Sequence, residues 1–343
     1  MTMELSRRGM LCSLASAGLA AVTRAPAAAA PTAAPATAPA TKHAAHGADF
    51  MAGLRGGAIA DPAKNGFDPT KLLRDFDRGT TRRLASGRVV REWELVAGEQ
   101  EIELAPGVTF PAWTYNGRVP GPTLRATEGE LLRIRFVNAT GHPHSIHFHG
   151  IHAASADGVP GSGPAIIAPG QSTTYEFTAT PYGLHLYHCH AFPLAVHLAR
   201  GLYGAFLIDP AEPRAEADEL VMVMNAFDLD ADGENEIYAV NSIPFAYMAE
   251  PIAVKADSPV RIHLANLTEY DPVNSLHVHA NLFEYIPTGT KRFPSEYTDT
   301  VMLCQGQRGI AEMRFPHPGR YMFHAHQSEF TELGWMGVFE VTA

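Results

Sequence analysis

Residues 185–190 read His-Leu-Tyr-His-Cys-His, and the tripeptide His188-Cys189-His190 decides how the rest of the chain is interpreted. On an extended strand, successive side chains point to opposite faces, so the two histidines face one way and Cys189 faces the other. Thiolate and imidazole both suit copper. A strand of this kind can therefore serve two metal sites, one on each face.

Partner histidines occur upstream with the same division of faces. In the run Gly-His-Pro-His-Ser-Ile-His-Phe-His-Gly, His147 and His149 share one parity and His144 has the other. The second half of the chain adds two more His-x-His pairs, namely His277 with His279 and His324 with His326. Four such pairs and a cysteine indicate metal binding, because isolated strand histidines rarely repeat in this way.

The two halves of the chain repeat one unit. Leu131–Thr140 resembles Pro259–Thr268, and short alternating segments between Gly/Pro turns follow in both halves. This pattern predicts an all-β protein of two tandem Greek-key β-sandwich domains. Asn274 stands at the place of His144 and Ala325 at the place of Cys189, so the second half keeps the paired histidines and lacks the cysteine-side ligands.

The domain boundaries follow from composition. Arg7-Arg8 precedes a short apolar stretch, which predicts a twin-arginine signal peptide over residues 1–30 and export to the periplasm or the medium. A flexible linker and N-terminal extension is expected over 31–84, with a helix near 69–81. The two sandwich domains are expected over 85–212 and 213–343.

Composition excludes several classes of partner. The chain has 343 residues and a formal net charge of -10, with no basic run beyond the N-terminus, so nucleic acid is not an expected partner. Three cysteines give no disulfide framework, and Cys304, in an apolar run, is expected to be a small buried side chain. No segment after the signal peptide is long and apolar enough to span a membrane.

These motifs, together with Asn116-Gly-Arg-Val-Pro-Gly-Pro-Thr-Leu-Arg125, resemble the two-domain bacterial multicopper oxidases over residues 85–343. The resemblance implies cupredoxin-like domains, with about four coppers per chain. It assigns the type 1 copper to the first domain, with His144, Cys189 and His197 as ligands. It assigns His147 and His277 to the type 2 copper. The type 3 pair would be held by His149, His188, His190, His279, His324 and His326.

Three further residues gain roles by the same resemblance. The family's axial methionine would fall at Leu202, which cannot coordinate, so the type 1 copper is expected to be three-coordinate. The loop from Cys189 to His197 is longer than in laccases and nearer that of copper nitrite reductases. Asp157 and Glu329 are candidate proton donors, although each also fits a turn or surface carboxylate.

The resemblance implies an oxidase that couples one-electron oxidation of a small donor to reduction of dioxygen to water. The donor is expected to be a phenol, with a metal ion as the alternative, because no Met-rich loop is present. A homotrimer with the cluster shared between subunits is expected. A copper nitrite reductase and a non-enzymatic copper-binding electron carrier are the alternatives. The remaining histidines are interpreted as ordinary polar side chains: His43, His46, His142, His152, His185, His263 and His317.

Overall fold

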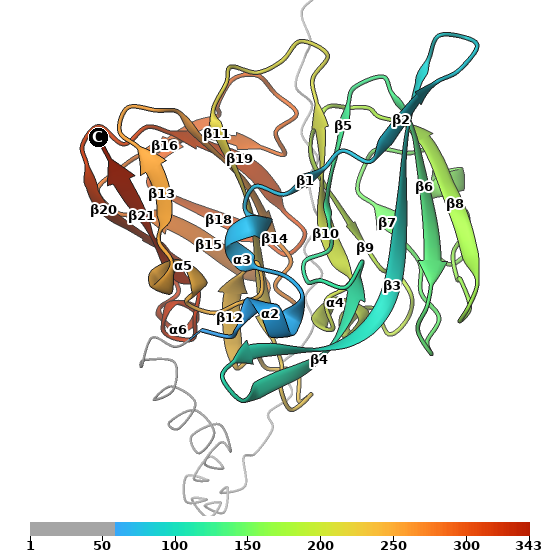
Figure 1. The fold of residues 1–343 in the computed structure, drawn as a ribbon, viewed down its shortest axis with the longest axis horizontal. Coiled ribbons are helices and arrows are strands. Elements are labelled where there is room, and N and C mark those ends of the chain that lie inside the picture. The colour runs from blue at the N-terminus through green and yellow to red at the C-terminus, as the bar shows by residue number, and fades with distance from the viewer. Residues whose placement is uncertain (1–58) are drawn as a thin grey trace, which may run out of the picture. The chain divides into compact units, whose positions relative to one another are not determined.

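The computed structural model describes residues 59–343, and these fold into two β-sandwiches that lie side by side (Figure 1). Each sandwich is built from two sheets. The predicted all-β class with two tandem cupredoxin-like domains is thereby confirmed. The signal peptide, His43 and His46 lie outside the described residues.

The first sandwich uses the strands up to residue 209. One sheet has the order β1-β5-β10-β9-β7, with strands Phe76–Asp77, Thr123–Thr127, Tyr203–Asp209, Gly183–His188 and His147–Phe148. The other has the order β2-β3-β6-β8, with strands Thr80–Arg83, Val89–Ala105, Leu131–Asn138 and Ser172–Thr178, and β4 (Val108–Tyr115) pairs with β3.

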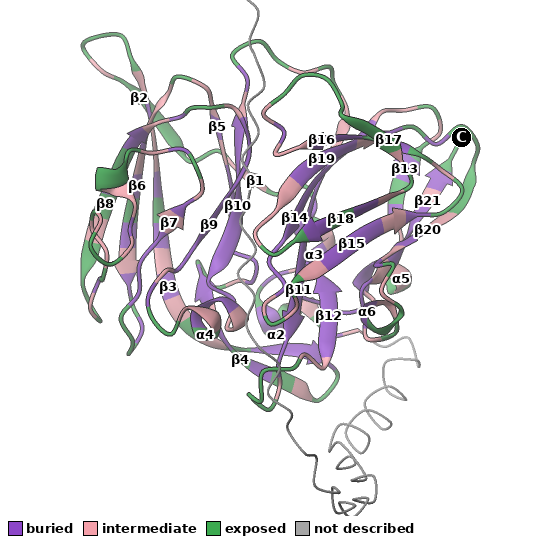
Figure 2. Cartoon of the chain, turned by 180° about the vertical axis from the view of Figure 1, so that it is seen from behind, coloured by how far each residue is buried: buried purple, intermediate pink, exposed green. Residues whose placement is uncertain are grey.

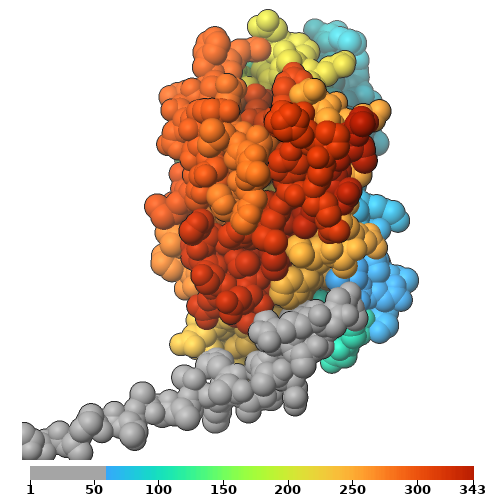
Figure 3. All heavy atoms as spheres, turned by 90° about the vertical axis from the view of Figure 1, so that its left-hand side faces the viewer, coloured from blue at the N-terminus to red at the C-terminus, as the bar shows by residue number. Residues whose placement is uncertain are grey.

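The second sandwich repeats this plan. One sheet has the order β13-β21-β20-β15-β18, with strands Ile252–Lys255, Met336–Thr342, Gly319–His324, Val273–Val278 and Thr300–Cys304. The other has the order β12-β11-β14-β19-β16-β17, with strands Ile237–Val240, Asp218–Phe227, Val260–Asn266, Arg308–Met313, Phe283–Pro287 and Glu296–Thr298. Its last strands form the face of the molecule seen in orange and red in Figure 3.

The repeat extends to strand register. His147 lies opposite His188 where β7 pairs with β9, and His277 lies opposite His324 where β15 pairs with β20. The repeated glycines have a packing role as well. A Cβ on Gly204 would lie 2.4 Å from Cζ of the facing Tyr187, and Gly337 faces Phe323 in the same way.

Each sandwich has its own apolar core, and a third apolar cluster joins them. The buried stretches follow the central strands of every sheet (Figure 2). In the joining cluster, Leu184 and Leu186 of β9 pack with Val221 and Val223 of β11. Each Å² of apolar surface buried between the two domains stabilises their contact by about 25 cal/mol.

The segment before the first domain is part of this unit from residue 59 onward. It carries helices α2 (Pro62–Asn65) and α3 (Pro69–Leu72), capped by Asp61 and Asp68. The helix predicted over 69–81 is wrong beyond residue 72, because the chain then pairs as β1 and β2. Leu73 is fully buried in the second-domain core, so this part of the extension packs against the folded domains.

The remaining helices are short: α4 (Leu194–Ala199), α5 (Ala246–Ala249), α6 (Ser328–Glu332) and one 3-10 turn, η1 (Ala154–Ala156). Across residues 59–343, none of the helices could cross a membrane. The expectation that Cys304 is buried is wrong. It ends β18 at a position whose side chain faces outward, and the thiol is exposed.

Candidate metal centres

The first centre lies between the sheets of the first sandwich. Nδ1 of His144 lies 3.1 Å from Nδ1 of His197, and the Sγ atom of Cys189 lies 3.7 Å and 3.2 Å from these two nitrogens. Ligand atoms about 2.0–2.3 Å from one ion would stand about this far apart. The three side chains therefore form a ready donor set, with His197 supplied by α4 and Cys189 by the segment after β9.

Burial tunes these donors for a metal. It lowers the pKa of His144 to about 3 and that of His197 to about 4, so both imidazoles are neutral ligands at physiological pH. The same burial raises the pKa of the Cys189 thiol, although backbone N–H groups of Ala191 and Ser145 oppose the shift. Binding of a metal as thiolate must therefore release the Cys189 proton.

The surroundings of the first centre are apolar and partly aromatic. Leu202 is fully buried in the same cluster as Cys189, and its carbonyl accepts the Cys189 N–H at 2.9 Å. Residues 59–212 contain no methionine, so this domain has no thioether to offer as an axial ligand. The side chain of His197 is only 3% exposed. The indole of Trp113 packs edge-on against it.

The first sandwich holds one half of a second centre, and each of these halves is called a half-site. His147, His149 and His188 offer nitrogens within 4.8 Å of one another, and the Nε2 atoms of His149 and His188 are 2.8 Å apart. The ring of His190 lies 5.4 Å from that of His147, and its buried Nδ1 has no partner among the described residues. These four histidines face away from Cys189, as the parity of the sequence predicts.

A matching half-site lies in the second sandwich. His277, His279 and His324 offer nitrogens within 4.8 Å of one another, and the Nε2 atoms of His279 and His324 are 2.9 Å apart. The ring of His326 lies 5.4 Å from that of His277. His279 and His326 are exposed. Within residues 59–343, no ring contact or hydrogen bond joins this half-site to the first one.

Hydrogen bonds fix which ring nitrogen is free in each half-site. Nδ1 of His147 donates to the backbone carbonyl of Asp157 at 3.1 Å and lies 2.9 Å from the Asp157 carboxylate oxygen. Nδ1 of His277 donates to Thr300 Oγ1 at 2.8 Å and to the Asp299 carbonyl at 3.0 Å. His188 donates from Nδ1 to the Cys189 carbonyl. With the proton on Nδ1, Nε2 keeps its lone pair for a metal.

Sequence reasoning missed several of these supporting groups. His152, interpreted as an ordinary polar side chain, lies 3.6 Å from the same Asp157 oxygen, and His185 bonds the backbone carbonyl of His149. Asp299 carried no sequence signal beyond its place before Thr300. Glu329 is exposed on α6, and in the described part of the chain its carboxylate contacts none of the cluster histidines. Asp157 is placed to orient His147, whereas Glu329 is not in contact.

The second sandwich has no counterpart of the first centre, and the packing of Trp335 accounts for this. Trp335, which aligns with Leu202, is fully buried, and its Nε1 donates to Oδ1 of Asn274 at 3.0 Å. Asn274 and Ala325 stand where the first domain has His144 and Cys189. Ala325 N–H donates to the Trp335 carbonyl, the counterpart of the bond from Cys189 to Leu202. An indole therefore fills the space that the first domain gives to a metal.

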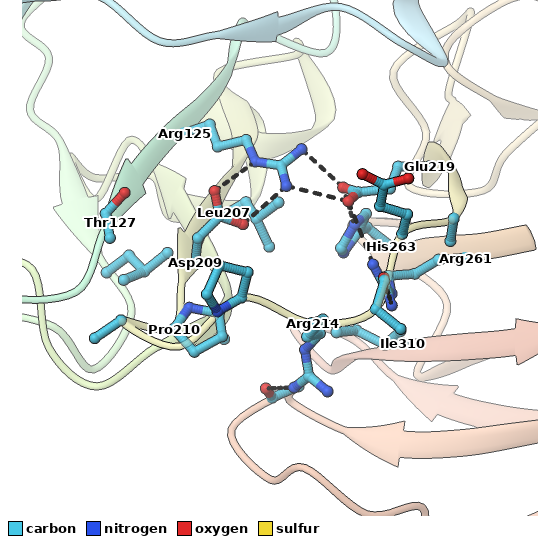
Figure 4. Close-up of a pocket in the computed structure, with 18 of the residues that line it drawn as sticks. Arg125, Thr127, Leu207, Asp209, Pro210, Arg214, Glu219, Arg261, His263 and Ile310 are labelled. Atoms are coloured by element: carbon cyan, nitrogen blue, oxygen red, sulfur yellow. Dashed lines mark hydrogen bonds and ion pairs between the residues drawn. The ribbon is translucent and has the colours of Figure 1, made fainter.

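A cavity of about 490 Å³ lies apart from both centres, at the junction of the two domains. Figure 4 shows Arg125 of β5 beside Glu219 of β11, with His263 and Arg261 of β14 on the far side. Glu219 accepts from Arg125, Arg261 and His263, at N···O distances of 2.7, 3.3 and 3.1 Å. His263 is thus part of an interdomain ion-pair network and not an isolated polar side chain.

The fold and the two donor sets define a copper protein built from cupredoxin-like domains. Family models described as multicopper oxidase match residues 97–213 and 217–343, and the chain belongs to this family. A solved structure of a multicopper oxidase is 59% identical, with a TM-score of 0.81, covering 82% of this chain and 99% of that one. The blue copper oxidase of Nitrosomonas europaea is 27% identical, with a TM-score of 0.65, over 74% of this chain and 86% of that one.

The chain is also similar to nitrite reductases. The copper-containing nitrite reductase of Neisseria meningitidis serogroup A is 28% identical over 248 residues, which is 66% of this chain and 63% of that protein. The chain thus spans less than two thirds of the length of the nitrite reductases from Neisseria. Copper fits the donor chemistry of both centres, since each combines several imidazoles and the first adds a thiol.

Proposed function

We propose that the protein is an oxidase that takes single electrons from a small donor and reduces dioxygen to water at a copper cluster. The observation that carries this proposal is the complete set of eight histidines, arranged as two half-sites of equal register. A one-copper electron carrier needs only His144, Cys189 and His197. Eight further imidazoles would then have no role.

We propose further that the cluster forms between copies of the chain, in a homotrimer. Each half-site holds four of the eight histidines, which is half of the ligand set proposed for the cluster. His279 and His326 are exposed, and exposed apolar residues flank the half-sites: Phe192 on the first domain, and Leu282 and Met302 on the second. A heterologous contact between first and second domains closes into a ring when the rotation allows it.

Bound copper would supply one-electron chemistry at His144, Cys189 and His197 and multi-electron chemistry at the histidine cluster. The residues of this chain connect the two centres and keep the histidine rings neutral and oriented. Cys189 and its flanking histidines connect the two centres through a few covalent bonds. The pKa of His188 is lowered to about 4 by burial, so its ring stays a neutral ligand. Asp157 holds the proton of His147 on Nδ1 and keeps the ring oriented.

Copper content and oxygen uptake test the function together. We expect about four coppers per chain, with oxygen uptake on 2,6-dimethoxyphenol. His147→Ala should lose oxygen uptake and keep the blue colour, whereas Cys189→Ser should lose both. His317→Ala is the matched control, because His317 is exposed and outside both centres. One copper per chain without oxygen uptake would support the electron carrier instead.

Nitrite reduction is the second candidate, favoured by the similarity to nitrite reductases. Such an enzyme would need about two coppers per chain and would consume nitrite under argon. The oxygen proposal fails if nitrite is reduced and dioxygen is not. For the assembly, a monomer in sedimentation that keeps full copper and full oxidase activity would contradict the shared cluster.

The donor and the compartment complete the proposal. A phenol is the proposed donor, with a metal ion as the alternative, and the twin-arginine sequence at Arg7-Arg8 supports export to the periplasm or the medium. Rates compared across phenols, Cu(I) and Fe(II) separate the donors. Fractionation of cells that express the full chain tests the compartment.

A further inference from the structure

The cavity at the junction of the two domains has walls from three parts of the chain. Strands β5 and β10 of the first domain line one side, strands β14 and β19 of the second domain line another, and the interdomain linker, residues 210–217, lines a third. Arg214 fastens this linker to the second domain, because its Nη2 donates to the carbonyls of Gly289 and Lys291 at 2.7 Å and 2.6 Å. Figure 4 shows Arg214 on the opposite side of the cavity from Arg125. The volume, about 490 Å³, is that of a small-molecule site.

Two polar groups in the cavity wall lack hydrogen-bond partners within residues 59–343. A guanidinium group has five N–H donors, yet only Nη2 of Arg214 has an acceptor there. His263 is 2% exposed, and its buried Nδ1 has no partner either. Because buried polar groups are costly to leave unpaired, this wall favours a polar ligand over a purely apolar one.

The charges in the wall favour an anion. Four arginines and three carboxylates line the cavity. Asp209 and Glu219 both accept from Arg125, and Glu216 is exposed to solvent. No carboxylate of the described chain forms an ion pair with Arg214, and burial lowers the pKa of this group. An anion beside Arg214 would therefore stabilise its charged form, although the chain as a whole carries a net charge of -10.

We propose that the cavity binds a small organic carboxylate, whose carboxylate group lies at Arg214 and whose apolar body packs against Leu207 and Ile310. The free N–H groups of Arg214 can give charge-assisted hydrogen bonds to a carboxylate, and these are stronger than hydrogen bonds between neutral groups. A single inorganic ion would fill little of the volume and would leave the apolar part of the wall uncovered. None of the described residues that line the cavity is a proposed copper ligand, so this site is separate from the two metal centres.

Binding of benzoate to the copper-free full chain tests this site directly. Calorimetric titration should show saturable binding of one benzoate per chain, and Arg214→Gln should weaken it about tenfold, the value of one hydrogen bond to a charged group. Arg320→Gln is the matched control and should bind as the unaltered chain does, because Arg320 is 60% exposed on β20 and pairs with Glu340. No saturable binding to the unaltered chain, or equal affinity in Arg214→Gln, would overturn the proposal.

A series of ligands tests the same site without any substitution, since Arg214→Gln also loosens the linker. Benzyl alcohol has the ring without the charge, and phosphate has the charge without the ring. Each should bind at least about tenfold more weakly than benzoate. Benzoate should also raise the melting temperature of the unaltered chain, because a ligand that contacts both domains binds only the folded protein. Benzyl alcohol or phosphate binding as tightly as benzoate, or a melting temperature that benzoate leaves unchanged at saturation, would overturn the proposal.

Discussion

Glu219 offers a sharp test of how the two domains are held together. Its carboxylate is 19% exposed and accepts from Arg125 of the first domain and from Arg261 and His263 of the second. These contacts hold the pKa of Glu219 well below its usual range, against the opposing effect of burial. Glu219→Gln keeps the shape and removes the charge, leaving two buried guanidinium groups with one carboxylate partner fewer.

The expected cost follows from the geometry. Breaking a buried ion pair costs about 3–5 kcal/mol. Here Arg125 keeps Asp209 and Arg261 keeps Glu312, so the lower end of that range, about 3 kcal/mol, applies. At about 2–4 °C per kcal/mol, the melting temperature should fall by about 6–12 °C. Glu94→Gln removes an exposed ion pair on β3 and should cost less than about 1 kcal/mol.

The pH dependence adds a second check. Burial lowers the pKa of His263 from 6.5, with Glu219 opposing, and the pKa of Glu219 is lowered from 4.5. Both groups therefore contribute stability above these unfolded values that is lost as pH falls, by about 1.4 kcal/mol for each unit of pKa difference. Denaturant unfolding should show the gap between the unaltered chain and Glu219→Gln narrowing below pH 4.5. A constant gap, or a cost no larger than that of Glu94→Gln, would refute the reasoning.

Three further outcomes are expected. Leu202→Met should add a thioether beside the first centre and lower the reduction potential of copper bound there, measured by redox titration; an unchanged potential and spectrum would show that residue 202 does not reach the metal. Gly204→Ala should cost at least about 1–3 kcal/mol in denaturant unfolding, because its Cβ would overlap Tyr187 at 2.4 Å, whereas Gly98→Ala meets only a 3.5 Å contact and should be nearly neutral. Copper uptake by the copper-free protein should release the raised-pKa proton of Cys189 in a pH-stat, and Cys189→Ser should release about one proton less.

The arrangement of the histidines was predictable because strand parity is a local rule. His147 and His188 lie on the cluster side and Cys189 on the other, although β9 ends at His188 and the alternation continues past the strand. The two-sandwich fold was predictable for the same reason, since alternation and turns recur at matching places in both halves. The pairing of β7 with β9 and of β15 with β20 gives both halves the same register, as the sequence repeat implied.

Features that depend on contacts between distant segments left no such signal. Trp113 comes from β4 and reaches the first centre across the sandwich, and nothing near it in sequence marks that contact. His263 looked like an ordinary polar residue because its carboxylate partner, Glu219, lies on another strand, β11. His152 lies only five residues before Asp157, but the 3-10 turn that brings the two side chains together has no clear sequence signal. The helix predicted near 69–81 stopped at Leu72, because pairing with β5 and β3 outweighs local propensity there.

The buried indole of Trp335 makes it difficult for the second domain to acquire the kind of metal site that the first domain has. Its Nε1 is bonded to Asn274 and its ring occupies the core of the second domain, so no single substitution reopens a metal site there. A cysteine in place of Ala325 alone would contact only apolar side chains of the core. Removing Trp335 alone would leave a cavity costing about 3–5 kcal/mol. The three missing ligands would have to be restored and Trp335 removed, which makes four changes, so packing keeps the second domain without a counterpart of the first centre.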